Sequence, residues 1–219
     1  MGSQSLISSF LTKTAEYQNF TLEDTIHHAK EVDSWRAPRE LQEKFPYYLA
    51  GYDFKDQPVW VAEVGKYNIK EQVLKGHDAA HNLTLYLFQG VHRIIKSMML
   101  KDTPTKEIRK VFFIGDCEGL DLNQATHLPT VSYALNIIRK YTDFVSLITG
   151  HVVGINVNYV ATLAFESLHP ALGNAFESIE LHGSDKAKWK TVLQKWLPAK
   201  AIPTWYGGSK EFKPIKVYG

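Results

Sequence analysis

The sequence predicts an α/β domain with a mostly parallel sheet flanked by helices. Residues 110–116 and 147–157 are nearly continuous runs of apolar or small side chains, which is typical of strands covered on both faces. A helical stretch, residues 127–144, lies between them. A helix joining two buried strands indicates a parallel βαβ crossover, and we place this unit at the centre of the fold.

Length and composition narrow the classes of protein. The chain has 219 residues, enough for one domain with an appendage. Its 25 basic and 23 acidic residues nearly balance, so the chain lacks the excess of positive charge that nucleic-acid binding needs, and we expect no nucleic-acid partner. The single cysteine, Cys117, excludes an internal disulfide and any multi-cysteine metal site, and favours a reducing, cytoplasmic setting. No apolar run approaches the roughly 18 residues that span a bilayer, and we find no signal peptide.

The N-terminal part reads as a helical extension over residues 1–44, followed by the main domain over 45–219. Thr21 and Asp24 have the spacing of a capping box that opens a helix running to about Val32. Residues 45–51 read as an aromatic connector, and 52–58 as a turn between two short strands. The outgoing strand spans 59–64 and ends at Gly65.

A long amphipathic helix is predicted over residues 77–100, where apolar side chains recur at helical spacing. A break at 102–104 separates it from the central unit. The remaining predicted elements, in order, are an apolar stretch at 158–176, a strand at 179–182, a lysine-rich helix at 185–196 and an irregular proline- and glycine-containing end at 198–208.

Catalytic and cofactor motifs are absent from the sequence. No dinucleotide fingerprint, phosphate-binding loop or nucleophile elbow occurs, and the nine histidines lack metal-site spacing, so we expect no metal and no cofactor. Asp116, Cys117 and Glu118 follow a central strand, where the ligand-contacting groups of α/β proteins gather. They could serve an enzyme. The favoured interpretation is a turn at Asp116 and Gly119, with Cys117 as a small buried hydrophobe.

Residues 161–172 leave two interpretations open. Ala161, Phe165, Leu168 and Leu172 form one apolar stripe at helical spacing. Periodicity alone favours an ordinary core helix, and the alternative is a mobile lid whose apolar face covers a ligand.

Several segments, in order, resemble the CRAL-TRIO lipid-binding domain of retinaldehyde-binding, tocopherol-transfer and phosphatidylinositol-transfer proteins. The segment Trp35–Gly51 looks most like the supernatant-protein-factor branch of that family. The resemblance covers about residues 45–212. The matching segments are Gln57–Trp60, Phe112–Gly119, Val153–Asn156 with the apolar run after it, Leu168–Leu172 and Ile202–Gly208.

The resemblance implies a gate helix over an apolar cavity, and a non-enzymatic protein that carries a hydrophobic molecule between membranes through transient membrane contact. The implied ligand is an isoprenoid, carotenoid, sterol-like or tocopherol-like molecule or a phospholipid. Val111 and Phe113 stand where phospholipid binders have small hydroxyl residues, which favours an apolar ligand. The implied ligand-binding residues are Trp60, Ala62, Tyr86, Phe88, Val111, Phe113, Ile137, Ala161, Phe165, Leu168, Leu172 and Phe176.

Two other classes of function stay open at this point. One is an α/β enzyme using Asp116, Cys117 or Glu118, and the other is a protein-interaction module of the same fold. The oligomeric state is not indicated by the sequence.

Overall fold

A six-stranded sheet forms the centre of the molecule, with strand order β5-β4-β3-β2-β1-β6. The computed structural model describes residues 21–172 and 177–219. Strands β2 (Pro58–Ala62), β3 (Val111–Asp116), β4 (Thr149–Ile155) and β5 (Ile179–Leu181) run parallel. Strands β1 (Tyr47–Tyr52) and β6 (Lys216–Tyr218) pair antiparallel at the other side. The predicted α/β class is confirmed.

The central βαβ unit is confirmed with small shifts of its ends. Helix α7 (Leu128–Ile148) joins β3 to β4, and Phe113 pairs with Val152 in the parallel register. The helix continues four residues beyond the predicted end, so β4 begins later than predicted. The predicted long helix is α5 (His77–Met99), and the predicted lysine-rich helix is α9 (Lys186–Trp196), capped by Asp185.

Two further helices form where the sequence predicted them, one in the N-terminal part and one in the apolar stretch after the central unit. Helix α2 (Leu22–Ser34) begins with the predicted capping box of Thr21 and Asp24. Helix α8 (Tyr159–Leu172) follows β4. The shorter helices α3 (Arg39–Lys44), α4 (Ile69–Leu74) and α6 (Leu122–Ala125) were not predicted as separate elements, since each offers at most two turns of periodicity. The part of the extension before residue 21 lies outside the described residues.

The aromatic connector predicted at 45–51 is wrong from residue 47 onward, because Tyr47–Tyr52 form β1. Tyr47 and Leu49 point into one hydrophobic core, and Tyr48 and Ala50 point into the other. Because both faces of β1 are buried, its side chains are apolar throughout and lack the alternation that marks a half-exposed strand. Strand β6 was also missed.

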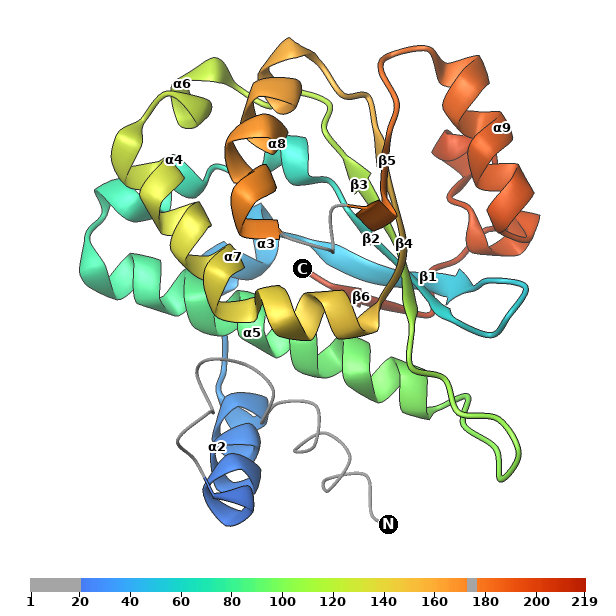
Figure 1. Cartoon of the computed structure of the whole chain (residues 1–219), viewed down its shortest axis with the longest axis horizontal. Coiled ribbons are helices and arrows are strands. Elements are labelled where there is room, and N and C mark those ends of the chain that lie inside the picture. The colour runs from blue at the N-terminus through green and yellow to red at the C-terminus, as the bar shows by residue number, and fades with distance from the viewer. Residues whose placement is uncertain (1–20, 173–176) are drawn as a thin grey trace.

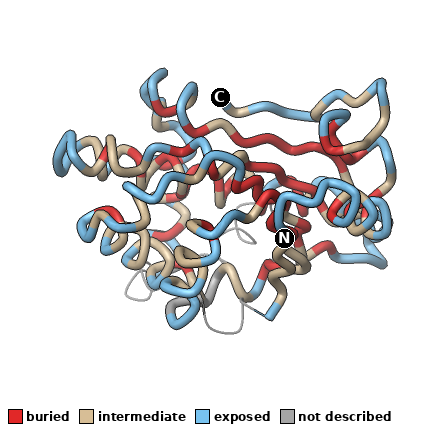
Figure 2. Tube along the Cα trace, turned by 90° about the horizontal axis from the view of Figure 1, so that it is seen from above, coloured by how far each residue is buried: buried red, intermediate tan, exposed pale blue. Residues whose placement is uncertain are grey.

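More helices cover one face of the sheet than the other (Figure 1). Helix α9 and the segment after it cover one face through a core that includes Val61, Ile114 and Trp189. Helices α5, α7 and α8 lie over the other face, where Trp60 and Tyr86 belong to a second core. The buried strands lie between helices whose outer turns are exposed (Figure 2). No helix of the described residues is long and apolar enough to cross a membrane.

Candidate functional site

An apolar pocket of about 300 Å³ lies beyond the carboxyl end of β3. Ligand sites in open α/β sheets gather at this edge, and the volume is at the lower end of the roughly 300–1,000 Å³ of small-molecule sites. None of the lining side chains carries a formal charge. They are Val64, Tyr67, Ile69, Cys117, Leu120, Gln124, Ala125, Thr130, Val131, Ala134, Ala164, Phe165, Ser167 and Leu168.

One side of the pocket is formed by residues 64–74, which we call the anchored wall. A side chain at Gly65 would collide with the backbone of Cys117 and Glu118, so glycine is needed where the ends of β2 and β3 meet. The Tyr67 hydroxyl donates to the Pro46 carbonyl oxygen at 2.5 Å, and the Tyr67 ring lies 5.2 Å from the Phe45 ring. These contacts tie the wall to the two residues that precede β1.

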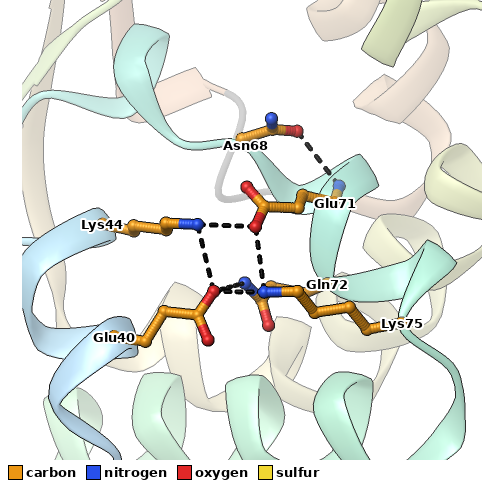
Figure 3. Close-up of polar contacts among 6 residues, drawn as sticks. All are labelled: Glu40, Lys44, Asn68, Glu71, Gln72 and Lys75. Atoms are coloured by element: carbon orange, nitrogen blue, oxygen red, sulfur yellow. Dashed lines mark hydrogen bonds and ion pairs between the residues drawn. The ribbon is translucent and has the colours of Figure 1, made fainter.

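A network of charged side chains holds the anchored wall to α3 (Figure 3). Lys44 of α3 contacts Glu71 at 2.5 Å and Glu40 at 3.0 Å, and Lys75 contacts Glu71 at 2.9 Å and also pairs with Glu40. Buried Gln72 donates to Glu40 at 3.3 Å. The lysines lower the pKa of Glu40 to about 2, with the bond from Lys75 the largest cause. The network links two short helices that have little stability alone.

The opposite side of the pocket is α8, which we call the gate wall. The Asn158 side chain accepts from the Ala161 amide at 2.8 Å and so caps the helix start. Two of its hydroxyls, on Thr162 and Ser167, donate to carbonyls of the same stretch rather than across to another element. Pro170 lies inside the helix, and a proline there lacks the amide that bonds one turn back. The Asn158 amide also donates to the Leu120 carbonyl at 3.4 Å, and Phe165 and Leu168 present apolar side chains to the pocket.

The pocket lining includes neutral hydrogen-bonding groups. The Thr130 hydroxyl lies 2.8 Å from Nδ1 of His127. The Gln124 side-chain oxygen accepts from the Lys70 amide at 3.4 Å. Ser167 adds a hydroxyl on the gate wall. These groups suit a ligand whose body is apolar and whose polar end lies near them.

Hydrogen bonds to Asp116 hold the segment Asp116–Glu118 in place where β3 ends. The buried Asp116 carboxylate accepts from Tyr206 Oη at 2.6 Å and Asn156 Nδ2 at 2.9 Å, and its Oδ1 also accepts from the Glu118 amide at 2.9 Å. Cys117 is buried, as we expected, and lines the apolar pocket. Burial, and then the neighbouring Asp116 charge, raises the pKa of the Cys117 thiol to about 12. A thiol this weakly acidic is a poor nucleophile at neutral pH.

The structure gathers most of the predicted ligand residues on one face of the sheet but divides them between a core and the pocket. Trp60, Ala62, Tyr86, Phe88 and Val111 are buried in one core, and Phe113 and Ile137 pack against it. Ala161 is buried on α8, and Phe165 and Leu168 line the pocket. The side chain of Leu172 and all of Phe176 lie outside the described residues. Contact of these residues with a ligand stays a prediction.

The central strands are incompletely covered beside that core. Phe113, Val152 and Ile179 pair in register across β3, β4 and β5, on the face that Trp60 shares. Trp60 is 1% exposed, whereas the other three side chains are only half-buried. This row of apolar side chains continues the apolar surface under α7 and α8.

Much of the pocket lining was missed by the sequence analysis. Tyr67 and Ile69 follow β2 in a segment that we had not assigned, and Leu120 follows Gly119. Val64 was predicted as the last residue of the strand, without a role in the pocket. The available signal was positional: both segments come directly after the carboxyl ends of predicted strands. Among the residues that the structure describes, no three His, Cys, Asp or Glu side chains are grouped to hold a metal ion.

Comparison with known proteins agrees with this architecture. Residues 42–208 match the CRAL/TRIO domain. Among solved structures, the crystal structure of Sfh5 is similar with a TM-score of 0.61 at 11% sequence identity, over 96% of this chain and 73% of that one. The structural likeness concerns the fold, and the domain match covers most of the chain. The chain therefore belongs to the CRAL/TRIO domain family, whose proteins generally bind and transfer lipids and other hydrophobic small molecules.

Proposed function

We propose that this protein binds one hydrophobic molecule, of isoprenoid-like, sterol-like or tocopherol-like character, in the pocket beneath α8 and carries it between membranes. The observation that carries the proposal is the uncharged lining of the pocket, with Phe165 and Leu168 on its gate wall. Each methylene group transferred from water contributes roughly 0.8 kcal/mol, so such a pocket can compete with a bilayer for its ligand.

Exposed apolar side chains beside the pocket support transient membrane contact. Leu122, Leu128 and Tyr159 are 48%, 77% and 75% exposed, and they lie at the starts of α6, α7 and α8. Residues 122–138, which include α6 and the first half of α7, contain no aspartate, glutamate, lysine or arginine. An exposed surface that combines large apolar side chains with few charges suits a lipid surface.

The enzyme alternative has less support. Cys117 is 1% exposed and has a raised pKa, and Asp116 is engaged by three donors. A catalytic dyad needs a base within reach of its nucleophile, and these groups instead stabilise the chain where β3 ends. We therefore propose a carrier without catalytic activity.

Mass spectrometry of organic extracts from the purified protein tests the proposal. We expect a stoichiometric hydrophobic molecule, and we expect the protein to move a fluorescent tocopherol or sterol between donor and acceptor vesicles. Absence of any extracted lipid, together with no binding of these probes, would contradict a carrier. Sensitivity of a measurable turnover to a thiol reagent would restore the enzyme alternative.

A further inference from the structure

A polar groove adjoins the apolar pocket along the same two chain segments. Neighbouring residues divide between the two hollows: Ile69 lines the pocket and Lys70 the groove, and Leu120 lines the pocket and Asp121 the groove. Gln124 lines both. The hydrogen bond from the Lys70 amide to Gln124 Oε1, at 3.4 Å, therefore lies at the junction. A molecule that crosses this junction would have one end in each environment.

Lys70 is the side chain of the groove that is best placed to bind an anion. It is half-buried, and no carboxylate of the described residues lies within the 4.0 Å of an ion pair from its ammonium group. By contrast, Lys66 in the same groove is paired with Glu63. The Asp121 charge acts on Lys70 only from beyond ion-pair distance, so the half-buried ammonium lacks a direct counter-ion. A bound anion would offset the free-energy cost of this partial desolvation.

The other groove side chains can add neutral donors. Asn68 uses its side-chain oxygen to cap α4, at 3.0 Å from the Glu71 amide, which leaves its NH₂ group as a donor (Figure 3). Asp121 is the one carboxylate that lines the groove, and its two oxygens accept from the backbone and side chain of Asn123. That carboxylate opposes an anion, so its removal should strengthen anion binding.

We propose that this groove holds the anionic end, a phosphate or carboxylate, of a single-chain amphiphile whose apolar chain occupies the pocket. The proposal rests on the proposed function, because the chain must enter the pocket beneath α8. A pocket of about 300 Å³ accommodates one slender chain rather than the two acyl chains of a phospholipid. The Lys70 ammonium binds the anion, and Gln124 lies where the chain leaves the pocket.

Calorimetric titration with dodecyl phosphate, dodecanol and inorganic phosphate tests the proposal. We expect dodecyl phosphate to bind more tightly than dodecanol. Lys70→Gln should reduce the ratio of the two affinities about three- to tenfold, as for a partly exposed charge contact. Asp121→Asn should raise that ratio. Lys55→Gln, which removes an exposed lysine of the β1–β2 turn, is the matched control and should leave it unchanged.

Each contrary result has a distinct meaning. Equal affinities for dodecyl phosphate and dodecanol, or an unchanged ratio in Lys70→Gln, would overturn the anion groove while the carrier function stands. Inorganic phosphate binding as tightly as dodecyl phosphate would show a site for a free anion, and would overturn the amphiphile. Failure of both dodecyl compounds to bind would overturn this inference, whereas the proposed function is contradicted only when the tocopherol and sterol probes also fail to bind and no lipid is extracted.

Discussion

The two walls of the apolar pocket are held in place by different kinds of interaction. The anchored wall is tied through Tyr67 to Pro46 and through Glu71 to α3, and Lys75, the residue directly after the wall, adds a pair with Glu40 of α3. The gate wall is one helix whose Thr162 and Ser167 hydroxyls bond within their own stretch and whose Phe165 and Leu168 face the pocket. Polar networks have specific geometry, whereas apolar contacts are non-directional. From this difference we expect α8 to move when a ligand enters and residues 64–74 to stay in place.

The largest expected effect is the loss of stability caused by a substitution in the anchored wall. Tyr67→Ala removes a buried ring that packs on Phe45 and a hydrogen bond to Pro46. Truncation of a large buried aromatic residue costs about 3–5 kcal/mol. We expect a loss of this size in the free energy of unfolding from urea titration. A loss below about 1 kcal/mol would show that this wall is not fixed by Tyr67.

The second prediction concerns the gate wall. Leu168→Asp places a charge against the apolar pocket, and that charge has no partner in the lining. If α8 opens readily, the protein should stay near its wild-type stability while retention of a bound fluorescent lipid falls at least tenfold. Thermal unfolding and retention are measured together on the same samples.

Thr162→Asp is the matched control, because it adds the same charge at an exposed position of α8. It should leave both quantities near wild type. Loss of several kcal/mol in Leu168→Asp would indicate a core helix instead of a gate. Unchanged stability with unchanged retention would also reject the gate, because Leu168 would then touch no ligand.

The sequence revealed the central βαβ unit and α8 because their patterns are long. It did not reveal β6, since two of its three residues are exposed and its position depends on pairing with β1. Nor did it locate the pocket. Periodicity shows that α8 has an apolar stripe. It does not show a cavity, because a cavity forms where apolar faces of different elements do not pack fully against one another. That depends on how Val64 and Leu120 lie against Phe165, which are far apart in the chain.

A smaller effect is expected at Cys117. Cys117→Ala should cost about 1 kcal/mol, as for a small buried side chain, and lipid retention should persist because neighbouring apolar side chains close the pocket. A pKa of about 12 predicts slow labelling of the folded protein by a thiol reagent at pH 7.5, with fast labelling in denaturant. Rapid labelling of the folded protein would show that this end of the pocket opens often.

The smallest effect concerns acid stability of the anchored wall. The pKa of Glu40 is about 2 in the folded protein and near 4.5 when unfolded, so its pairs with Lys75 and Lys44 stabilise the fold above about pH 4.5. That contribution is lost as the pH falls from about 4.5 towards 2. Because the side chains are exposed, we expect a slight change. Glu40→Gln should flatten the pH dependence of the melting temperature in this window. An unaltered profile would assign acid sensitivity to other carboxylates.

Hydrogen exchange of the two walls, measured with and without a bound ligand, tests the central claim most directly. In the ligand-free protein, we expect amides of α8 to exchange at least tenfold faster than those of residues 67–74, because α8 opens locally. Ligand should slow exchange in α8 and leave residues 67–74 nearly unchanged. Equal protection of both walls in the ligand-free protein, with no change in α8 on binding, would contradict a gate that moves against an anchored wall.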